Sequence, residues 1–339
     1  MATIKDVAQL AQVNQAIVSR IINHDETLVI RDATRARVLR AIEELNYTPS
    51  YLGRSLRANA TKTLAIFVPD ILNPFYAEVL TGAERAATQH GFRVMIFHTE
   101  DSQKKEEELI GMAISYHVDG FLIASSLLGS TSHDRIAEYK KPCVFLQRRA
   151  KEADADSFFI TADDARGVEL ALDYLLGLGH TRIAHIAGPG NMFSARQRKQ
   201  AFCRVLSERG SLIPEYLIDG DFKLDAGYLA MQKLLALAQL PTAVLCCNDL
   251  AAIGAINAIT AGGLRVPEDI SVVGFDDIWI AAQTRPALTT VRISAGDQGA
   301  LAVDTIISLL KDQSIQPRTV MIPPQLVVRS SAAACRPDP

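Results

Sequence analysis

The sequence has few cysteines and no pattern that would pair them. Its five cysteines form an odd set without a CxxC pair, which argues against a disulfide framework and against a zinc ribbon. No run reaches the roughly 18 apolar residues that a membrane span needs, and the first residues lack a basic start followed by an apolar core. We therefore expect a cytoplasmic protein that does not contact a membrane.

Motifs of common enzyme classes are missing as well. There is no GxxxxGK[ST] phosphate loop and no HExxH metal motif, and Gly188-Pro189-Gly190 lacks the third glycine of a dinucleotide fingerprint. His90, His117 and His185 each stand alone in or beside apolar segments, where histidines are usually structural. No catalytic residue, metal or cofactor is predicted, and the protein is not expected to be an enzyme.

Charge of one sign is not in large excess, but its distribution is uneven. The net charge is −3, whereas residues 1–60 hold eight Lys and Arg against six Asp and Glu. A length of 339 residues with 48% hydrophobic and 22% charged residues indicates an ordered protein of two or three folding units. The slightly basic N-terminal part is therefore the place to look for contact with nucleic acid.

The N-terminal sixty residues show three helical patterns. Thr3 and Asp6 resemble a capping pair at the start of a helix over residues 3–11. Asn14 is an N-cap candidate for a second helix, and Asp32 is one for a third. Periodicity alone leaves two interpretations open. One is a three-helix bundle with solvated arginines, and the other is a helix-turn-helix whose second helix enters the DNA major groove.

The rest of the chain alternates short apolar runs with helical patterns. Such runs, separated by helices, indicate parallel sheets covered on both faces. The length predicts an α/β architecture of two doubly wound subdomains with a ligand cleft at the carboxyl ends of the strands. The predicted strands are residues 64–68, 94–97, 120–124, 143–146, 158–160, 183–187, 217–220, 244–246 and 271–274.

Several ordered motifs carry a family resemblance. They are Thr3 to Ala8, Val18 to Asn23, Thr34 to Leu39, Ala41 to Tyr47 with Pro49, Gly179 to Ala184, Asn248-Asp249, and Asp269 to Asp277. Over about residues 2 to 330 the chain resembles the lactose-repressor (LacI/GalR) family. The resemblance implies a helix-turn-helix headpiece over 1–48, a hinge helix over 49–61 and a tail over 331–339. The core between them, 62–330, would have the fold of periplasmic sugar-binding proteins, with subdomains at 62–161 with 292–322 and at 162–291 with 323–330.

For DNA binding, the resemblance places Gln15, Ala16 and Arg20 at the base-reading positions. Gln pairs with adenine and Arg with guanine, whereas Ala16 offers only apolar contact to a thymine methyl group. In the linker, Leu56 would wedge into the minor groove, although a plain surface linker is the alternative. The implied DNA-binding residues are Thr3, Asn14, Gln15, Ala16, Ser19, Arg20, Asn23, Tyr47, Ser50, Leu52, Gly53 and Leu56.

The headpiece departs from the family pattern at several positions. Two extra residues lie in the loop between Asn23 and Thr34. These changes preserve the implied fold but alter the residues near the DNA. At the differing positions this chain has Gln12 where the family usually has the turn glycine, Asn14 in place of Ser or Thr, Ile17 in place of Thr, Arg31 in place of Ser, and Gly53 in place of Ala.

The resemblance also implies a set of effector-binding residues. A sugar needs flat apolar faces and forked donors or carboxylates, and Arg148 would favour an anionic ligand. Three of these residues also have purely structural interpretations. Phe222 could belong to the core, Arg198 could be a charge on a helix surface, and Asp276 could be a helix cap. At the position of Gln147 many relatives carry Asp. The implied residues are Phe75, Gln147, Arg148, Ser194, Arg198, Phe222, Asn248 and Asp276.

Together these observations predict a homodimeric repressor of a pseudopalindromic operator. Its effector would be a sugar, sugar acid or sugar phosphate that changes the closure of the subdomains and hence operator affinity. Only ten residues, from Ser330 to Pro339, follow the last expected strand, which favours a dimer over a tetramer. The alternative is a cytoplasmic sugar-binding or sugar-modifying protein with an inert N-terminal bundle.

Overall fold

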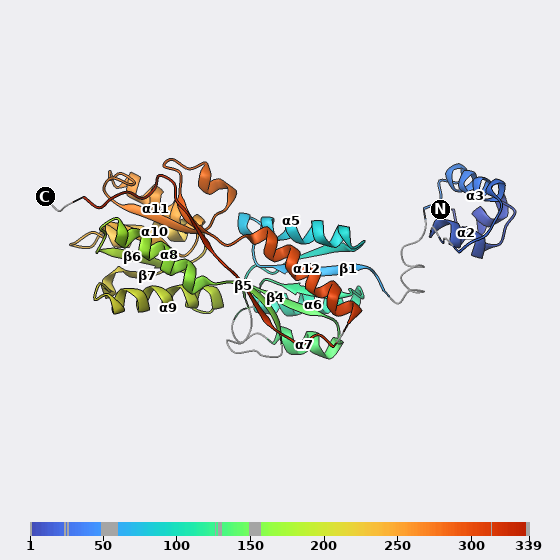
Figure 1. Ribbon diagram of the computed structural model, residues 1–339, viewed down its shortest axis with the longest axis horizontal. Helices are drawn as coiled ribbons and strands as arrows, with labels where there is room; N and C mark the ends of the chain where they lie inside the picture. The colour runs from blue at the N-terminus through green and yellow to red at the C-terminus, as the bar shows by residue number, and fades with distance from the viewer. Residues whose placement is uncertain are drawn as a thin grey trace. The chain divides into compact units, whose positions relative to one another are not determined.

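The structure is a computed structural model that describes residues 2–23, 25, 27–48, 60–125, 127, 131–148, 157–312 and 314–336. The chain divides into two compact units, Met1–Thr61 and Lys62–Pro339 (Figure 1). We call the first the headpiece and the second the core, and each is considered by itself. The predicted hinge residues lie outside the described residues; they are Ser50, Leu52, Gly53 and Leu56.

The headpiece consists, in its described part, of three helices around one small apolar core. These are α1 (Ile4–Leu10), α2 (Gln15–Ile22) and α3 (Asp32–Glu44), as the periodicity predicts. Each helix contributes a narrow apolar stripe, and burial of these stripes against one another is what stabilises helices of this length. The buried residues are Val7, Ala8, Ala11, Val18, Ile21, Leu28, Val38 and Ala41.

The starts of the helices agree with the predicted caps at two of three positions. Thr3 and Asp6 form a capping box at α1, and the Asn14 side chain accepts a hydrogen bond from the Ile17 amide at 2.9 Å. The prediction for Asp32 is wrong, because Arg31 is the N-cap of α3 and makes no side-chain cap bond. Asp32 is instead the first helical residue, where a carboxylate interacts favourably with the helix dipole.

Within its described residues, the core contains two six-stranded sheets, which confirms the predicted α/β class. The first sheet has the strand order β11-β5-β4-β3-β1-β2, and all its neighbouring strands are parallel. Its strands are β1 (Thr63–Val68), β2 (Arg93–His98), β3 (Gly120–Ile123), β4 (Cys143–Leu146), β5 (Phe158–Ala162) and β11 (Thr319–Ile322).

The second sheet has the order β12-β10-β9-β8-β6-β7, and only the β10–β12 pair is antiparallel. Strands β10, β11 and β12 are additional to those predicted, because their short segments do not stand out as continuous apolar runs. The strands of this sheet are β6 (Ile183–Ala187), β7 (Leu217–Asp219), β8 (Ala243–Cys246), β9 (Ser271–Asp276), β10 (Thr289–Arg292) and β12 (Gln325–Val327).

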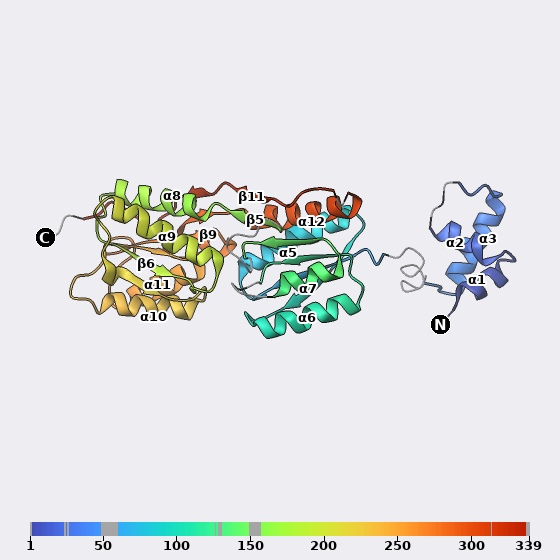
Figure 2. The same ribbon diagram turned by 90° about the horizontal axis from the view of Figure 1, so that it is seen from below.

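Helices cover both faces of each sheet. Figure 2 shows α12 (Ala295–Lys311) and α6 (Gln103–Ser115) on opposite faces of the first sheet, and α8 (Asp164–Gly177) and α10 (Leu224–Leu235) on opposite faces of the second. The pairs α5 with α12, α6 with α7, α8 with α9 and α10 with α11 pack against each other. The remaining helices are α5 (Pro74–Gln89), α7 (Ser132–Tyr139), α9 (Phe193–Glu208), α11 (Asp249–Ala261) and the 3-10 turns η1 (Pro214–Tyr216) and η2 (Trp279–Ala282).

The chain passes three times between the two sheets, and we call these passages the crossings. They lie between β5 and α8, between β10 and α12, and between β11 and β12. β5 ends at Ala162 and β10 at Arg292, one residue beyond the expected subdomain limits in both cases. None of the described helices is long and apolar enough to span a bilayer.

The segment after residue 330, expected as a tail, is packed in its described part. Ser331 is fully buried, and its carbonyl accepts a hydrogen bond from the Val272 amide at 2.8 Å. Further along, the His180 ring lies 3.0 Å from the Ala333 carbonyl through Nε2. These contacts fix the segment to the second subdomain.

The turn between α1 and α2 contains a testable source of strain. Gln12 has a φ of 52°, in the left-handed region where a side chain costs about 1 kcal/mol and glycine costs nothing sterically. We expect Gln12→Gly to raise the free energy of unfolding of the headpiece by about 0.5 kcal/mol, since glycine also loses more entropy on folding. Hydrogen exchange of headpiece amides in the full chain measures this change.

The matched control is Gln9→Gly, at an exposed position inside α1. There the backbone is helical, so glycine should destabilise the headpiece by about 1 kcal/mol. If both glycine variants lower protection to the same extent, the strain assigned to Gln12 is absent.

Candidate functional site

The first candidate site is the exposed face of α2. Gln15, Ala16 and Arg20 are exposed, whereas Val18 and Ile21 on the opposite face are buried in the headpiece core. The three predicted base-reading side chains therefore lie on one side of one helix. A helix of about 10 to 12 Å diameter fits the major groove of B-DNA, so this arrangement suits the contact that the sequence predicts.

The other described DNA-binding candidates are capping or packing residues of the headpiece. Thr3 and Asn14 are the N-caps of α1 and α2, so their side chains also hold the helix starts in place. Asn23 donates from Nδ2 to Ser19 Oγ at 3.5 Å, and Tyr47 packs half-buried against the headpiece core. These contacts fix the starts of α1 and α2 and attach Tyr47 to the headpiece core.

The second candidate site is a cavity in the core, between the two subdomains. Its walls come from both subdomains, from the loops at the ends of strands and from the first turns of helices. Seven of the eight predicted effector-binding residues line it, and Arg148 does not. The lining residues are Asn73, Phe75, Tyr76, Gln147, Ser194, Arg198, Phe222, Asn248 and Asp276.

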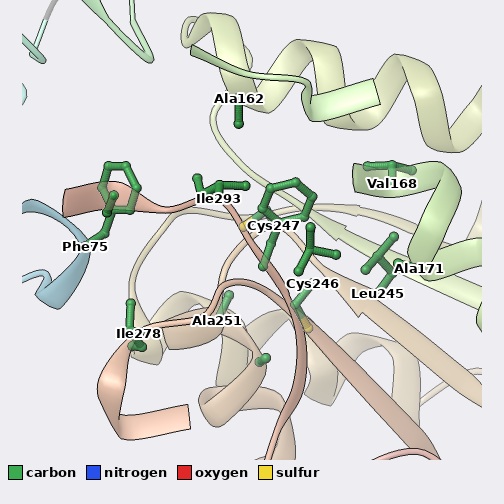
Figure 3. Packing of buried hydrophobic residues seen from close by; sticks show 14 of the residues in the cluster. Phe75, Ala162, Val168, Ala171, Leu245, Cys246, Cys247, Ala251, Ile278 and Ile293 are labelled. Carbon is green, nitrogen blue, oxygen red and sulfur yellow. The ribbon is translucent and has the colours of Figure 1, made fainter. Parts of the chain in front are cut away.

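Aromatic side chains form the first part of the wall. Phe75 and Tyr76 open α5 and meet edge to face with ring centroids 5.1 Å apart. The side chain of Asn73 caps this helix by accepting from the Phe75 amide at 3.0 Å. Phe75 belongs to one apolar cluster that runs through both subdomains and includes Ile293 and Cys247, drawn in Figure 3. The aromatic wall is thus anchored in the core.

A buried cation forms the second part. Arg198 is 4% exposed, so the alternative of a helix-surface charge is wrong. Its Nε donates to Asp164 Oδ1 at 2.8 Å, and its Nη1 donates to the Cys247 carbonyl at 2.5 Å and to Asp276 Oδ1 at 3.5 Å. Its guanidinium also lies 3.7 Å from the Phe275 ring centroid. A guanidinium held on several sides presents its remaining donors to the cavity in one orientation.

The carboxyl groups around this cation are destabilised as anions by their burial. Desolvation raises the pKa of Asp276 to about 7 and also raises the pKa of Asp164, while Arg198 opposes both shifts. Asp276 lies at the end of β9 with a φ of 114°. It is not a helix cap, so the structural alternative considered for this residue is wrong. It can therefore act as a cavity-facing group that accepts hydrogen bonds when ionised.

Buried hydrogen bonds fix the strained loop that carries Asp276. Asp249, fully buried, accepts a hydrogen bond from the Ile278 amide at 2.8 Å and from Thr290 Oγ1 at 2.5 Å. The next residue, Asp277, also has a positive φ of 59° and pairs with Arg329 Nη2 at 2.5 Å. These bonds keep a sparsely populated backbone conformation in place.

Asn248 has both of its amide atoms engaged by the protein. Its Oδ1 accepts from the Ala251 amide at 2.9 Å, and its Nδ2 donates to the Phe222 carbonyl at 2.9 Å. It therefore fixes the loop that carries Phe222, which is half-buried and lines the cavity rather than filling the core. Ser194, buried in the first turn of α9, lines the same cavity.

Gln147 connects the cavity to the crossings. Its Nε2 donates to Gln298 Oε1 at 2.8 Å, and its Oε1 accepts from Thr161 Oγ1 at 3.1 Å. Gln298 in turn donates to the carbonyl of Ile293. Thr161 lies just before the first crossing and Ile293 in the second, so one chain of hydrogen bonds joins both to a cavity-lining side chain.

Arg148 lies behind the cavity wall. Its Nη1 pairs with Asp101 Oδ1 at 2.5 Å, and its guanidinium carbon lies 5.8 Å from the Tyr76 ring centroid and 5.9 Å from that of Phe222. Because Asp101 compensates its charge, the sequence-based reason for an anionic ligand is weakened. The residue instead supports aromatic side chains of both subdomains.

The sequence interpretation missed Asn73, Tyr76 and Asp164 as parts of this site. Asn73 and Tyr76 flank Phe75 in the segment after the first strand, where the polar and aromatic composition is the signal that could have found them. Asp164 carries no such signal, because only the fold brings it to Arg198. Among the described residues, no group of three or more His, Cys, Asp or Glu side chains is placed to hold a metal ion.

A helix-turn-helix joined to a two-subdomain core with a polar cavity defines the class of ligand-controlled DNA-binding regulators. Comparison with known proteins gives the family. The model "Bacterial regulatory proteins, lacI family" matches residues 3–50, and "Periplasmic binding protein-like domain" matches residues 172–332.

Several relatives and solved structures match the chain over nearly its whole length. The HTH-type transcriptional repressor PurR of Pasteurella multocida is 36% identical over 98% of both chains. The ribose operon repressor of Escherichia coli is 35% identical over 98% of this chain and 100% of its own. A crystal structure of the lac repressor dimer bound to operator and the anti-inducer ONPF has a TM-score of 0.88 at 28% identity, and covers 98% of this chain and 99% of its own.

The chain therefore belongs to the lacI family of bacterial regulatory proteins. It is an effector-regulated transcriptional repressor that binds DNA, and it is not an enzyme. Such a regulator works in the bacterial cytoplasm, where its DNA lies. The alternative of a sugar-modifying protein with an inert N-terminal bundle is thereby set aside.

The pKa of Asp276 leads to a prediction about stability. In the folded protein this pKa is about 7, above its value in an unfolded chain. At pH values between these two pKa values, the folded state therefore carries a proton on Asp276 that the unfolded state has lost. Stability from this group is therefore present at low pH and is lost as the pH rises through 7. We expect Asp276→Asn to gain about 1 to 2 kcal/mol of stability relative to the wild type between pH 5.5 and pH 8.

Urea unfolding of both proteins at the two pH values measures this difference. Comparing the two chains cancels other titrating groups, such as His185, whose pKa is lowered to about 4 by burial. Parallel pH profiles for wild type and variant would show that the Asp276 carboxyl is ionised throughout this range.

Proposed function

We propose that this protein is a sequence-specific repressor whose operator affinity is controlled by a small carbohydrate-like effector in the cavity of the core. The observation that carries the proposal is the position of the cavity, because its lining comes from both subdomains. A ligand that bridges two movable parts stabilises one of their arrangements over the other. Closure of the core is then the step that the effector controls.

The chemistry of the lining favours a neutral sugar. Phe75 and Phe222 offer apolar faces, whereas Arg198 and Asp276 offer fixed donors and acceptors for paired hydroxyl groups. The name of the similar ribose operon repressor is consistent with this class of ligand.

Coupling to DNA would run through the crossings. Closure around a ligand changes the angle between the subdomains at these crossings, and Gln147 ties a cavity wall to two of them. A change in subdomain angle would alter the spacing of the two hinge segments in a dimer and hence the fit of two headpieces to an operator. Coupling of this kind is reciprocal, so DNA changes effector affinity by the same factor.

A homodimer is the assembly that we propose for the operator complex. A large apolar side chain in each subdomain lies in solvent: Leu72 is 85% exposed and Trp279 is 65% exposed. Exposed apolar surface of this kind is typical of protein interfaces. The lac repressor structure similar to this chain is a dimer on its operator, and a two-fold dimer matches a pseudopalindromic site.

Capture of fragmented genomic DNA from the source organism by the purified protein tests the DNA-binding part of the proposal. We expect enrichment of one pseudopalindromic sequence, because two copies of α2 read two related half-sites. A variant with Arg20→Ala is the control and should lose the enrichment. Binding that depends only on salt and not on sequence would contradict sequence-specific repression.

A ligand panel tests the effector part. We expect D-ribose or another neutral monosaccharide to raise the Tm of the full-length protein, and D-ribonate, D-ribose 5-phosphate and hypoxanthine to leave it unchanged. Arg198→Met should abolish the shift. A shift by the sugar acid or phosphate alone would restore the anionic class, and a shift by hypoxanthine alone would replace the sugar by a nucleobase.

A further inference from the structure

The loop between α2 and α3 holds the side chain of Arg20 through two hydrogen bonds. Arg20 Nε donates to Asp25 Oδ2 at 2.6 Å, and its Nη2 donates to Thr27 Oγ1 at 2.8 Å. The side chains of Arg20 and Asp25 are 44% and 31% exposed, so the pair lies at the surface beside the DNA-reading face of α2.

Asp25 and Thr27 are themselves fixed by hydrogen bonds to neighbouring parts of the headpiece. Asp25 Oδ1 accepts from the Thr27 amide at 2.9 Å and from Thr27 Oγ1 at 2.7 Å. The Asp25 amide donates to the Arg20 carbonyl at 3.0 Å, and the Leu28 amide donates to the Asp25 carbonyl at 3.1 Å. Leu28 is buried in the headpiece core. The carboxylate is therefore fixed to both the end of α2 and the core.

The hydrogen bonds use one particular edge of the guanidinium group. A guanidinium has two edges that can form a bidentate contact, one made by Nε with Nη2 and one made by Nη1 with Nη2. Asp25 and Thr27 occupy the Nε edge. The terminal edge, made by Nη1 with Nη2, is not the edge that Asp25 and Thr27 hold. Paired N–H donors of this kind match O6 and N7 of guanine.

We propose that Asp25 is a positioning residue for operator recognition, which together with Thr27 presents the terminal edge of Arg20 to one guanine in each half-site. The inference rests on the proposed function, in which Arg20 reads a base. A long side chain that is already oriented loses less rotamer entropy when it binds. The fixed edge also excludes contacts that a freely rotating arginine makes to other bases or phosphates.

The proposal has a signature that a general loss of stability does not share. Asp25 carries a negative charge close to the DNA face, and its pKa is lowered to about 2 by Arg20 and Thr27, so it stays ionised at neutral pH. Removing it frees a cation for contact with any phosphate, which strengthens binding to nonspecific DNA. At the same time the guanine preference at one base pair weakens. The two effects have opposite signs.

The experiment is a selection of bound duplexes from a randomised pseudopalindromic DNA library, with full-length wild type and variants. For Asp25→Ala, we expect the guanine preference at one base pair of each half-site to fall by part of the about fivefold to hundredfold discrimination that one bidentate pair gives, because Arg20 itself is retained. The other positions should keep their preferences. Affinity for a random duplex should rise, and the slope of log affinity against log salt should steepen by about one unit.

Two further variants keep the test decisive if Asp25→Ala unfolds the loop. Thr27→Val removes one bond from the same edge without changing charge, so it should weaken the same base preference but leave the salt slope unchanged. Asp25→Asn keeps an acceptor and removes the charge, so it should steepen the slope but retain part of the preference.

An unchanged motif in Asp25→Ala and Thr27→Val would overturn the proposal. So would a uniform loss of preference at all positions, because that result would make Asp25 only a stabiliser of the headpiece. Arg20→Ala separates this failure from failure of the proposed function. If Arg20→Ala erases the guanine preference and the Asp25 variants do not, Arg20 reads the base without positioning. If Arg20→Ala leaves the motif intact, the base-reading assignment itself is wrong.

Discussion

The cavity between the subdomains depends on one buried cation. A charge taken out of water is tolerated only where opposite charges and hydrogen bonds surround it, and Arg198 meets this condition through Asp164, Asp276 and the Cys247 carbonyl. Asp164 begins the first helix after a crossing, and Asp276 ends a strand of the second sheet. The same set of bonds therefore positions the cavity lining and the start of the second subdomain.

Much of this architecture could be predicted from the sequence. Short apolar runs separated by helices indicated the α/β class, because strands buried on both faces must be apolar throughout. Edge strands β11 and β12 were missed, since their residues are only partly buried and their composition is mixed. The family resemblance indicated seven of the cavity residues, several of which lie at the end of a strand or in the first turn of a helix.

Other features follow only from the folded structure. Arg148 and Arg198 are both arginines in polar segments, yet one lies behind the wall with Asp101 and the other inside it. No local pattern distinguishes them, because their partners lie far away along the chain. Likewise, Arg31 replaced Asp32 as the N-cap of α3, a shift of one residue that depends on how the preceding loop enters the helix.

The third crossing has a consequence for synthesis of the protein. β11 completes the first sheet beside β5 and β12 completes the second beside β10, although both strands come from the last part of the chain. A nascent chain on the ribosome therefore exposes its headpiece long before either sheet has its final edge. DNA-binding residues emerge first and the effector-responsive core last, so a prematurely terminated polypeptide would lack the part through which a ligand controls it.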